Sequence, residues 1–343
     1  MNNSDSKTRC RIVIDAMGGD YAPQNAVVGA IQAFNENGKF DLFLVGKKNE
    51  IQKVIAANNL SFNENDIINA DEVIEMGDQP TAAIKTKPNS SIVVGAKLVK
   101  DKKADAFVSA GNTGAMMAAS TLIIGRIPGV GRPTIGQAMP NQSGISTLFD
   151  VGASVDSKPK HLLEYALMGT IFTKEIYGIE NPKVGILSVG EEDSKGNEVT
   201  LAAAELIRKT NLNFVGNVEG RDILKGTVNV VVCDGFVGNI LIKFGESVLD
   251  FLKFKFRDYA NKGFINKLKI ALVRSSMREI LKDFDYQEYG GVPLLGVNGI
   301  SVIGHGSSTP KAIKNMVLRA YEMYEKNLVQ KIENSIKQYS NLN

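Results

Sequence analysis

Tryptophan is absent from this sequence, cysteine and histidine occur only twice each, and neither sign of charge dominates, because the net charge of the 343 residues is +3. Cys10 and Cys233 are too few for a disulfide-rich secreted fold and indicate a reducing, cytoplasmic compartment. Such a small net charge gives no reason to predict nucleic acid as a partner. No cluster of zinc-type ligands occurs in the sequence, so we expect no bound metal.

Long uncharged runs are also scarce. Residues 1–9 lack the apolar core of a secretory signal peptide. Residues 106–125 are uncharged for long enough to cross a bilayer, but they include three glycines as well as Ser109, Asn112 and Thr113. We therefore expect a strand, a loop and a buried helix there instead of a spanning helix.

Three familiar loop motifs are missing as well. There is no G-x-G-x-x-G loop typical of dinucleotide binding, no G-x-x-x-x-G-K-[ST] loop typical of nucleotide triphosphatases, and no G-x-S-x-G elbow typical of serine hydrolases. These absences disfavour nicotinamide-dependent, nucleotide-hydrolysing and hydrolase chemistry.

The feature that the sequence does contain is a strand that breaks into glycines before a helix. Residues 12–14 are β-branched, DAMGGD follows at 15–20, and a helix is predicted from Gln24 to Phe34. Such a loop directs backbone N–H groups and a helix N-terminus at one point, which suits an anion, and Asp15 and Asp20 are expected to fix it. The alternative is an ordinary tight turn between a strand and a helix.

The same arrangement recurs at three later places. SAGNTGA at 109–115, DGFVGN at 234–239 and GHGSSTP at 304–310 each follow a predicted strand and precede a predicted helix. We place the helix after the second of these loops at Ile240, and predict Thr309 as the N-cap of the last one. The alternation predicts one α/β domain over residues 1–343 with a doubly wound, mostly parallel sheet, whose strand-end loops form one ligand crevice.

Two long connections look irregular. Residues 71–91 form a polar stretch that holds Lys85 and Lys87, which are either solvated or placed to attract an anion. Residues 125–144 are rich in glycine and proline and are predicted to be a loop that offers Arg126 and Arg132 to anions.

Residues 245–289 interrupt the alternation. This segment has no strand pattern, and from Asp250 to Lys282 it carries nine basic residues against three acidic ones. Its apolar residues recur at helical spacing, which predicts a helical protrusion. A basic amphipathic surface is typical of contact with anionic lipid, while a dimer-forming helix pair or an ordinary solvated helix explains the same pattern.

Glycine loops with nearby lysines and a histidine fit phosphate as the acceptor in a group transfer. A phosphate dianion is nucleophilic at neutral pH, so the protein has to align it with an activated carbonyl and stabilise the resulting oxyanion. Backbone N–H groups can do both, and His305, which is flanked by two glycines, can act as the acid or base.

The strings IDAMGGDYAP, SAGNTGA, DVGASVD, GEEDSKGNE, DGFVGN and IGHGSS together resemble the PlsX family of phosphate acyltransferases over nearly the whole chain. The resemblance implies a fold similar to phosphate acetyltransferases and to the isocitrate dehydrogenase type. It also implies transfer of a fatty acyl group from acyl carrier protein to inorganic phosphate, without a cofactor, by a homodimer at the membrane periphery. A membrane acyltransferase would then use the acyl phosphate for phospholipid synthesis.

Four positions depart from the usual strings of that family. Tyr21 replaces a histidine, Lys85 an arginine, Pro88 a lysine and Ser154 an asparagine. Lys85 keeps the positive charge but loses the bidentate fork of arginine.

The residues expected to act directly on the reaction are His305, Asn112 and Lys85. Those expected to bind phosphate and substrate are Asp15, Gly18, Gly19, Asp20, Ser109, Gly111, Thr113, Gly114, Asp234, Gly235, Asn239, Gly306 and Ser307. Two alternatives remain open at this point: a short-chain phosphate acyltransferase that uses acyl-coenzyme A, and a lipid-binding scaffold without catalysis.

Overall fold

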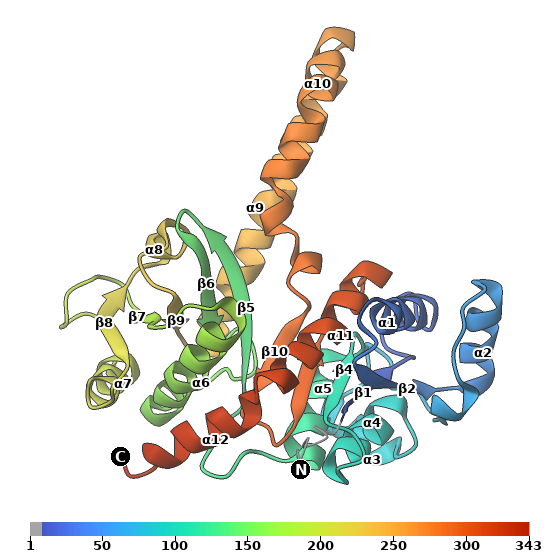
Figure 1. Cartoon of the computed structure of the whole chain (residues 1–343). Coiled ribbons are helices and arrows are strands. Elements are labelled where there is room, and N and C mark those ends of the chain that lie inside the picture. The colour runs from blue at the N-terminus through green and yellow to red at the C-terminus, as the bar shows by residue number, and fades with distance from the viewer. Residues whose placement is uncertain (1–8, 343) are drawn as a thin grey trace, which may run out of the picture.

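The computed structural model describes residues 9–342, which fold around one eleven-stranded sheet in the order β3-β2-β1-β4-β11-β10-β5-β6-β9-β7-β8 (Figure 1). The strands are β1 Cys10–Asp15, β2 Phe40–Gly46, β3 Ile67–Asn69, β4 Ala106–Ser109, β5 Thr134–Asn141, β6 Gly144–Phe149, β7 Lys183–Leu187, β8 Asn213–Val218, β9 Val230–Val232, β10 Val292–Leu295 and β11 Ile300–Ile303.

Twelve α-helices are described within the same range. They are α1 Gln24–Asn37, α2 Lys48–Ala57, α3 Pro80–Thr86, α4 Ser91–Lys100, α5 Thr113–Ala119, α6 Pro159–Tyr177, α7 Glu198–Arg208, α8 Gly220–Lys225, α9 Gly235–Asn261, α10 Phe264–Ile280, α11 Pro310–Glu325 and α12 Leu328–Gln338. A π-helical turn, η2 Ser120–Ile124, continues α5.

The sheet has two halves whose strands run in opposite directions. In one half, β3, β2, β1, β4 and β11 are parallel neighbours, and in the other β6, β9, β7 and β8 are parallel neighbours. Three successive antiparallel pairings, β11–β10, β10–β5 and β5–β6, join the halves. The predicted α/β fold with a mostly parallel sheet is confirmed, but the strands do not all run the same way.

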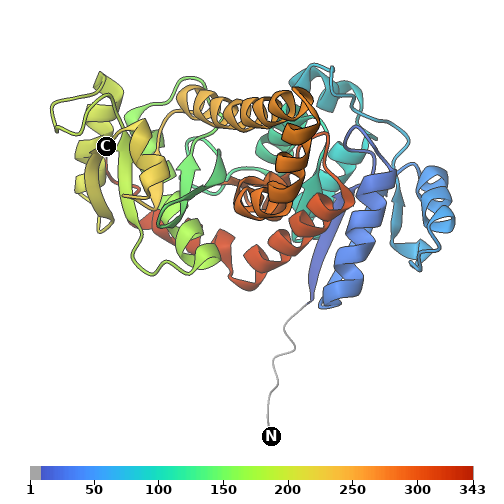
Figure 2. The same cartoon turned by 90° about the horizontal axis from the view of Figure 1, so that it is seen from above.

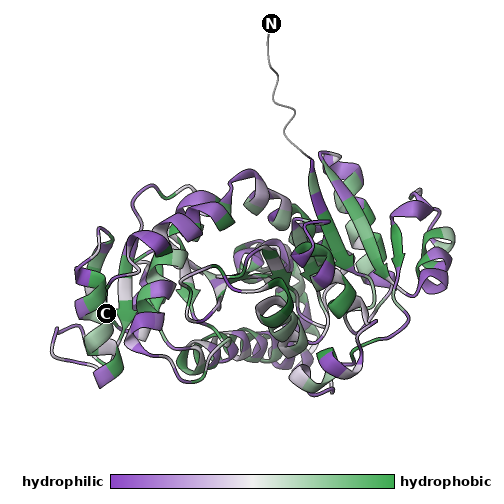
Figure 3. Cartoon of the chain, turned by 90° about the horizontal axis from the view of Figure 1, so that it is seen from below, coloured by the Kyte–Doolittle hydropathy of each residue, from purple (hydrophilic) through white to green (hydrophobic). Residues whose placement is uncertain are grey.

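Helices cover both faces of the sheet because successive strand residues point to opposite sides. Ile12 and Ile14 of β1 pack in the core beneath α1, α6 and α11, whereas Val13 packs in the core beneath α4 and α5. All three side chains are fully buried. In Figure 3 the strands are mainly hydrophobic, while the surrounding helices alternate between hydrophilic and hydrophobic residues, as a three-layer fold requires.

The two long helices α9 and α10 form a hairpin that projects away from the body of the protein (Figure 1). Seen from above in Figure 2, the hairpin stands between the two halves of the sheet. The chain enters α9 directly from β9, and after α10 it returns to the body beside β5 and α11. Among residues 9–342, no helix is long and apolar enough to cross a bilayer.

Three local predictions are wrong. Residues 134–141, predicted as loop, form β5, because pairing with β6 and β10 supplies hydrogen bonds that its one glycine and one proline do not suggest. Residues 80–86 form α3, which starts with Pro80 in its first turn. Helix α9 begins at Gly235, five residues before Ile240, because the side chain of Asp234 accepts the N–H of Val237 as an N-cap.

Candidate active site

The loop after β1 is fixed by a buried carboxylate. Asp15 ends β1 and is 1% exposed. Its Oδ1 accepts the N–H of Met17 at 3.0 Å, and its Oδ2 accepts the hydroxyl of Ser109 at 2.7 Å. Burial raises the pKa of Asp15, and hydrogen bonds from Ser91 and Ser109 partly oppose that rise. Asp15 therefore holds its own loop and ties it to the loop after β4.

The first and second loops approach so closely that glycine is required between them. The Oγ of Ser109 also accepts the N–H of Gly111 at 3.0 Å. A Cβ on Gly18 would lie 2.5 Å from Asp15 Oδ2, 2.7 Å from the Gly111 nitrogen and 2.9 Å from Ser109 Oγ. Any side chain at this position would push the two loops apart.

The loop after β11 closes on the first loop from another side. The N–H of Asp20 donates to the carbonyl of Gly306 at 2.8 Å. Gly19 has φ +110°, and a Cβ there would lie 3.1 Å from the same carbonyl. A Cβ on Gly306 would lie 2.8 Å from Asp20 Oδ1. Residues 15–20, 109–114 and 304–308 thus meet in space, as the sequence predicts.

These loops also carry backbone donors that the protein itself does not use. Within residues 9–342, the N–H groups of Gly19, Thr113 and Gly306 donate to no other protein group. Thr113 is the first residue of α5, where a helix leaves its N–H groups unpaired. Unpaired donors on three touching loops are an arrangement that an oxyanion can satisfy.

His305 belongs to the third of these loops, the one that follows β11. Its ring is exposed, and its Nδ1 accepts the N–H of Ser307 at 3.3 Å and lies 2.8 Å from the Ser307 hydroxyl. With Nδ1 as the acceptor, the neutral ring carries its proton on Nε2. The loop therefore fixes the orientation of the His305 ring through Nδ1.

The loop after β9 belongs to a second cluster. A Cβ on Gly235 would lie 2.4 Å from Asp150 Oδ2, and a Cβ on Gly152 would lie 3.7 Å from Asn239. The side chain of Asp234 caps α9. The predicted residues Asp234, Gly235 and Asn239 are therefore placed against residues 150–154, which follow β6 in the half of the sheet that runs the opposite way.

Comparisons with known proteins agree with the family resemblance that the six sequence strings suggest. A family model described as "Fatty acid synthesis protein" matches residues 10–331. Proteins named "Phosphate acyltransferase" from Pelotomaculum thermopropionicum and Halothermothrix orenii are 48% and 44% identical to this chain, covering 95% of it and 95% and 98% of their own lengths. The chain belongs to the PlsX family of phosphate acyltransferases.

Solved structures show where else this fold occurs. A phosphotransacetylase from Streptococcus pyogenes matches with a TM-score of 0.62 at 20% identity, covering 93% of this chain and 95% of its own. A phosphotransacetylase from Staphylococcus aureus matches with a TM-score of 0.57 at 16% identity, covering 92% and 94%. The predicted likeness of fold to phosphate acetyltransferases is confirmed.

The sequence suggests that Asn112 acts directly on the reaction, but in the structure of this phosphate acyltransferase its side chain bonds to backbone groups. Its Oδ1 accepts the N–H of Ala115 at 2.9 Å as the N-cap of α5. Its Nδ2 donates to the carbonyls of Glu75, Met76 and Asp78 at 3.0, 3.1 and 3.1 Å. The amide is fully engaged with backbone groups and clamps residues 75–78 onto the start of α5.

The two predicted lysines of the enzyme have different surroundings. Lys87 donates to Asp78 Oδ2 at 2.5 Å and to the carbonyl of Val73 at 2.9 Å, and this contact lowers the pKa of Asp78. Lys85 lies exposed on α3, next to the loop that Asn112 clamps. A Cβ on Gly114 would lie 2.5 Å from Pro80, so α3 packs directly on the start of α5. Lys87 is structural here, while Lys85 is open to solvent.

Asp150 of the enzyme is not among the predicted site residues, but its surroundings resemble those of Asp15. It is fully buried, and it accepts the N–H groups of Ile135, Ala153 and Ser154 at 3.1, 3.1 and 2.8 Å. Burial raises its pKa, as it does for Asp15. Asp150 directly follows a buried strand and begins the string DVGASVD. Asp15 likewise follows a β-branched strand, so the same sequence pattern could have identified both.

A pocket of about 270 Å³ lies elsewhere in the enzyme. Asp105, Ile300 and Tyr324 line it, at the amino-terminal ends of β4 and β11. It is therefore at the opposite ends of these strands from the glycine loops. In the described part of the chain, no three His, Cys, Asp or Glu side chains are grouped to hold a metal ion.

Proposed function

We propose that this enzyme transfers a long-chain fatty acyl group from acyl carrier protein to inorganic phosphate and releases acyl phosphate. The observation that carries the proposal is the meeting of residues 15–20, 109–114 and 304–308, which carry unpaired N–H groups and, in the last of these loops, an exposed histidine. Membership of the phosphate acyltransferase family supports phosphate as the acceptor.

In the proposed reaction, a phosphate oxygen attacks the carbonyl carbon of the donor thioester. A C–O bond forms, and the carbonyl electrons move onto oxygen to give a tetrahedral oxyanion. When the carbonyl re-forms, the C–S bond breaks and the sulfur leaves with the electron pair as a thiolate. The chain has to position phosphate, stabilise the oxyanion and supply a proton to the thiolate.

The N–H groups of Gly19, Thr113 and Gly306 are the proposed donors to phosphate and oxyanion. The main chain can approach closely because Gly18 and Gly111 leave no Cβ in the way. His305 is the proposed acid: its protonated ring, hydrogen-bonded at Nδ1 to the Ser307 hydroxyl, gives the Nε2 proton to the thiolate and takes a proton back from the bound hydrogen phosphate. Asp15 and Ser109 act indirectly by holding the first two loops together.

Lys85 is proposed to attract the donor. It is exposed, and it lies on α3, which packs against the start of α5 at the site. A carrier protein with an acidic surface would be steered toward such a cation.

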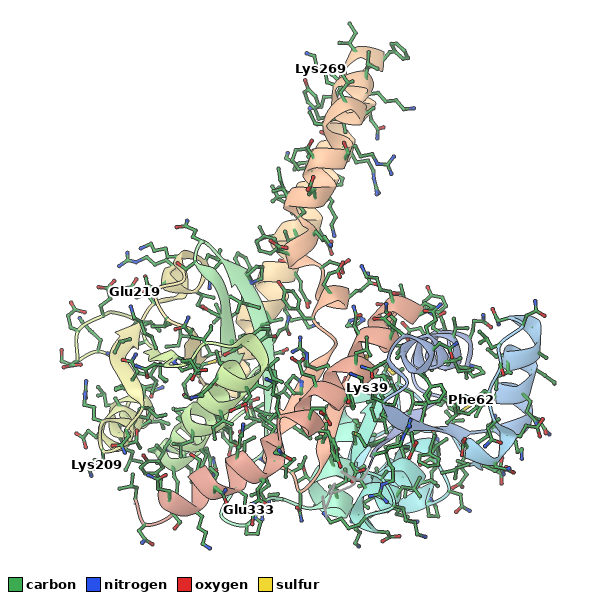
Figure 4. The ribbon with its side chains drawn as sticks, viewed as in Figure 1. Lys39, Phe62, Lys209, Glu219, Lys269 and Glu333 are labelled. Carbon is green, nitrogen blue, oxygen red and sulfur yellow. The ribbon has the colours of Figure 1, made fainter. Side chains whose placement is uncertain are left out.

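The α9–α10 hairpin is proposed to contact an anionic membrane, where a membrane acyltransferase can take up the acyl phosphate. Phe264, Ile265, Leu268 and Leu272 are 81%, 69%, 53% and 73% exposed. Basic residues alternate with them along the sequence, and one of these, Lys269, is labelled near the tip of the hairpin in Figure 4. Apolar side chains among lysines and arginines suit a lipid surface with negative headgroups.

We also propose a homodimer, as the family resemblance implies, and the exposed apolar residues of α9 are a surface that a second copy could cover. Light scattering of the purified chain measures this directly. A monomeric mass at micromolar concentration would contradict it.

The deciding experiment mixes palmitoyl acyl carrier protein with phosphate and the purified chain and looks for palmitoyl phosphate by mass spectrometry. We expect the product to appear with equimolar release of free carrier protein. Turnover of acetyl-coenzyme A but not of the palmitoyl carrier protein would favour the short-chain alternative. No phosphate-dependent loss of thioester would favour the non-catalytic scaffold.

A further inference from the structure

A large apolar side chain beside the glycine loops is exposed to solvent. Met76 is 52% exposed, and its terminal methyl lies 3.1 Å from where a Cβ on Gly306 would be. Asp20 Oδ1 lies 2.8 Å from the same point. Met76 and Asp20 therefore flank Gly306, and Met76 is the apolar member of this pair. Binding of phosphate does not call for an apolar neighbour.

The loop that carries Met76 is held firmly. Asn112 donates to three carbonyls, those of residues 75, 76 and 78. Asp78 Oδ2 accepts the N–H of Glu75 at 2.8 Å, and the N–H of Asp78 donates back to the carbonyl of Glu75 at 3.1 Å. The ammonium group of Lys87 also donates to Asp78 Oδ2. A surface loop fixed by this many bonds presents its side chain at little entropic cost when a ligand arrives.

We propose that Met76 contacts the fatty acyl chain of the donor where the chain leaves the reacting carbonyl, and that Asn112 is the residue that positions it. This inference rests on the proposed function. The carbonyl carbon must come within bonding distance of phosphate, so the first carbons of the chain have to lie beside the glycine loops. Met76 offers a flexible thioether side chain at this place, and such side chains adapt to apolar ligands.

The test separates the acyl chain from the rest of the donor. Met76→Ala is assayed for the KM of palmitoyl carrier protein, the KM of phosphate, and the inhibition constant of carrier protein without an acyl group. We expect the first to rise about tenfold, because the loss of a few apolar contacts with a substrate has effects of this size. The other two should stay unchanged, and Met76→Leu should restore most of the loss.

Asn112→Asp tests the positioning role, because it keeps the cap of α5 but removes the amide donors. We expect Asn112→Asp to raise the KM of palmitoyl carrier protein as Met76→Ala does, and we expect no further rise in that constant when the two substitutions are combined. Leu224→Ala, at a 49% exposed apolar residue on α8, is the matched control and should change none of the three constants.

The inference is overturned if Met76→Ala leaves the KM of palmitoyl carrier protein unchanged. It is equally overturned if the inhibition constant of the acyl-free carrier protein rises by the same factor, because the contact would then be with the carrier and not with its acyl chain. Failure of the proposed function is a separate result: the unmodified chain would show no phosphate-dependent loss of thioester.

Discussion

Gly18→Ala is the substitution that probes the meeting of the glycine loops most directly. The added methyl would lie 2.5 Å from Asp15 Oδ2 and 2.7 Å from the Gly111 nitrogen, closer than any normal contact. Neither neighbour can yield easily, because Asp15 is buried and hydrogen-bonded and the nitrogen belongs to the main chain. The first and second loops must therefore separate.

The size of the effect follows from overpacking. Forcing a methyl into a filled site costs about 1–3 kcal/mol of unfolding free energy. A displacement of about 1 Å in a group that positions a reactant can lower the rate about 100-fold. We therefore expect a folded protein with a moderately lower Tm and about 100-fold lower kcat/KM for phosphate.

The assay is phosphate-dependent release of free carrier protein from the palmitoyl donor, with Tm measured in parallel. Gly220→Ala is the matched control, because a Cβ there meets nothing within 4 Å. Full activity of Gly18→Ala with an unchanged KM for phosphate would refute the claim that the touching loops form the phosphate site.

Other perturbations test separate parts of the site and surface. Because burial raises the pKa of Asp15, the folded protein holds that proton more tightly than the unfolded chain does. Stability should therefore fall as the pH rises from about 4 through the raised value, and Asp15→Asn should show a smaller fall in chemical denaturation. His305→Ala should lower kcat about 100-fold with little change in the KM of phosphate, and an unchanged kcat would exclude it as the proton donor. Replacing Leu268 and Leu272 together with glutamate should release the protein from anionic vesicles while activity in solution persists, and equal vesicle binding would contradict the membrane surface.

The glycine loops could be predicted from the sequence because their signals are local. A β-branched strand such as residues 12–14, two glycines and a helix start follow one another within a dozen residues. Local sequence also predicted Thr309 as an N-cap. The structure confirms this, because the Thr309 hydroxyl accepts the N–H of Ala312. Local sequence is sufficient here because strands, turns and caps depend on near neighbours.

Strand β5 shows where this logic fails. Gly136 and Pro140 made residues 134–141 look like a loop, yet both of these residues pair with β6. The hydrogen bonds and burial that make this segment a strand come from partners on either side of it in the sheet. Local propensity is a weak guide when tertiary pairing decides the structure.

The sequence by itself determined which short segments form glycine loops between a strand and a helix, since each of these strings contains the residue types that allow tight turns and close approach. Tertiary structure alone decided what each residue touches. In the folded chain, the amide of Asn112 donates to carbonyls 34–37 residues away in sequence. The loop with Asp234 and Asn239 packs beside residues 150–154. Contacts between distant segments depend on strand order and direction, and no short stretch of sequence encodes either.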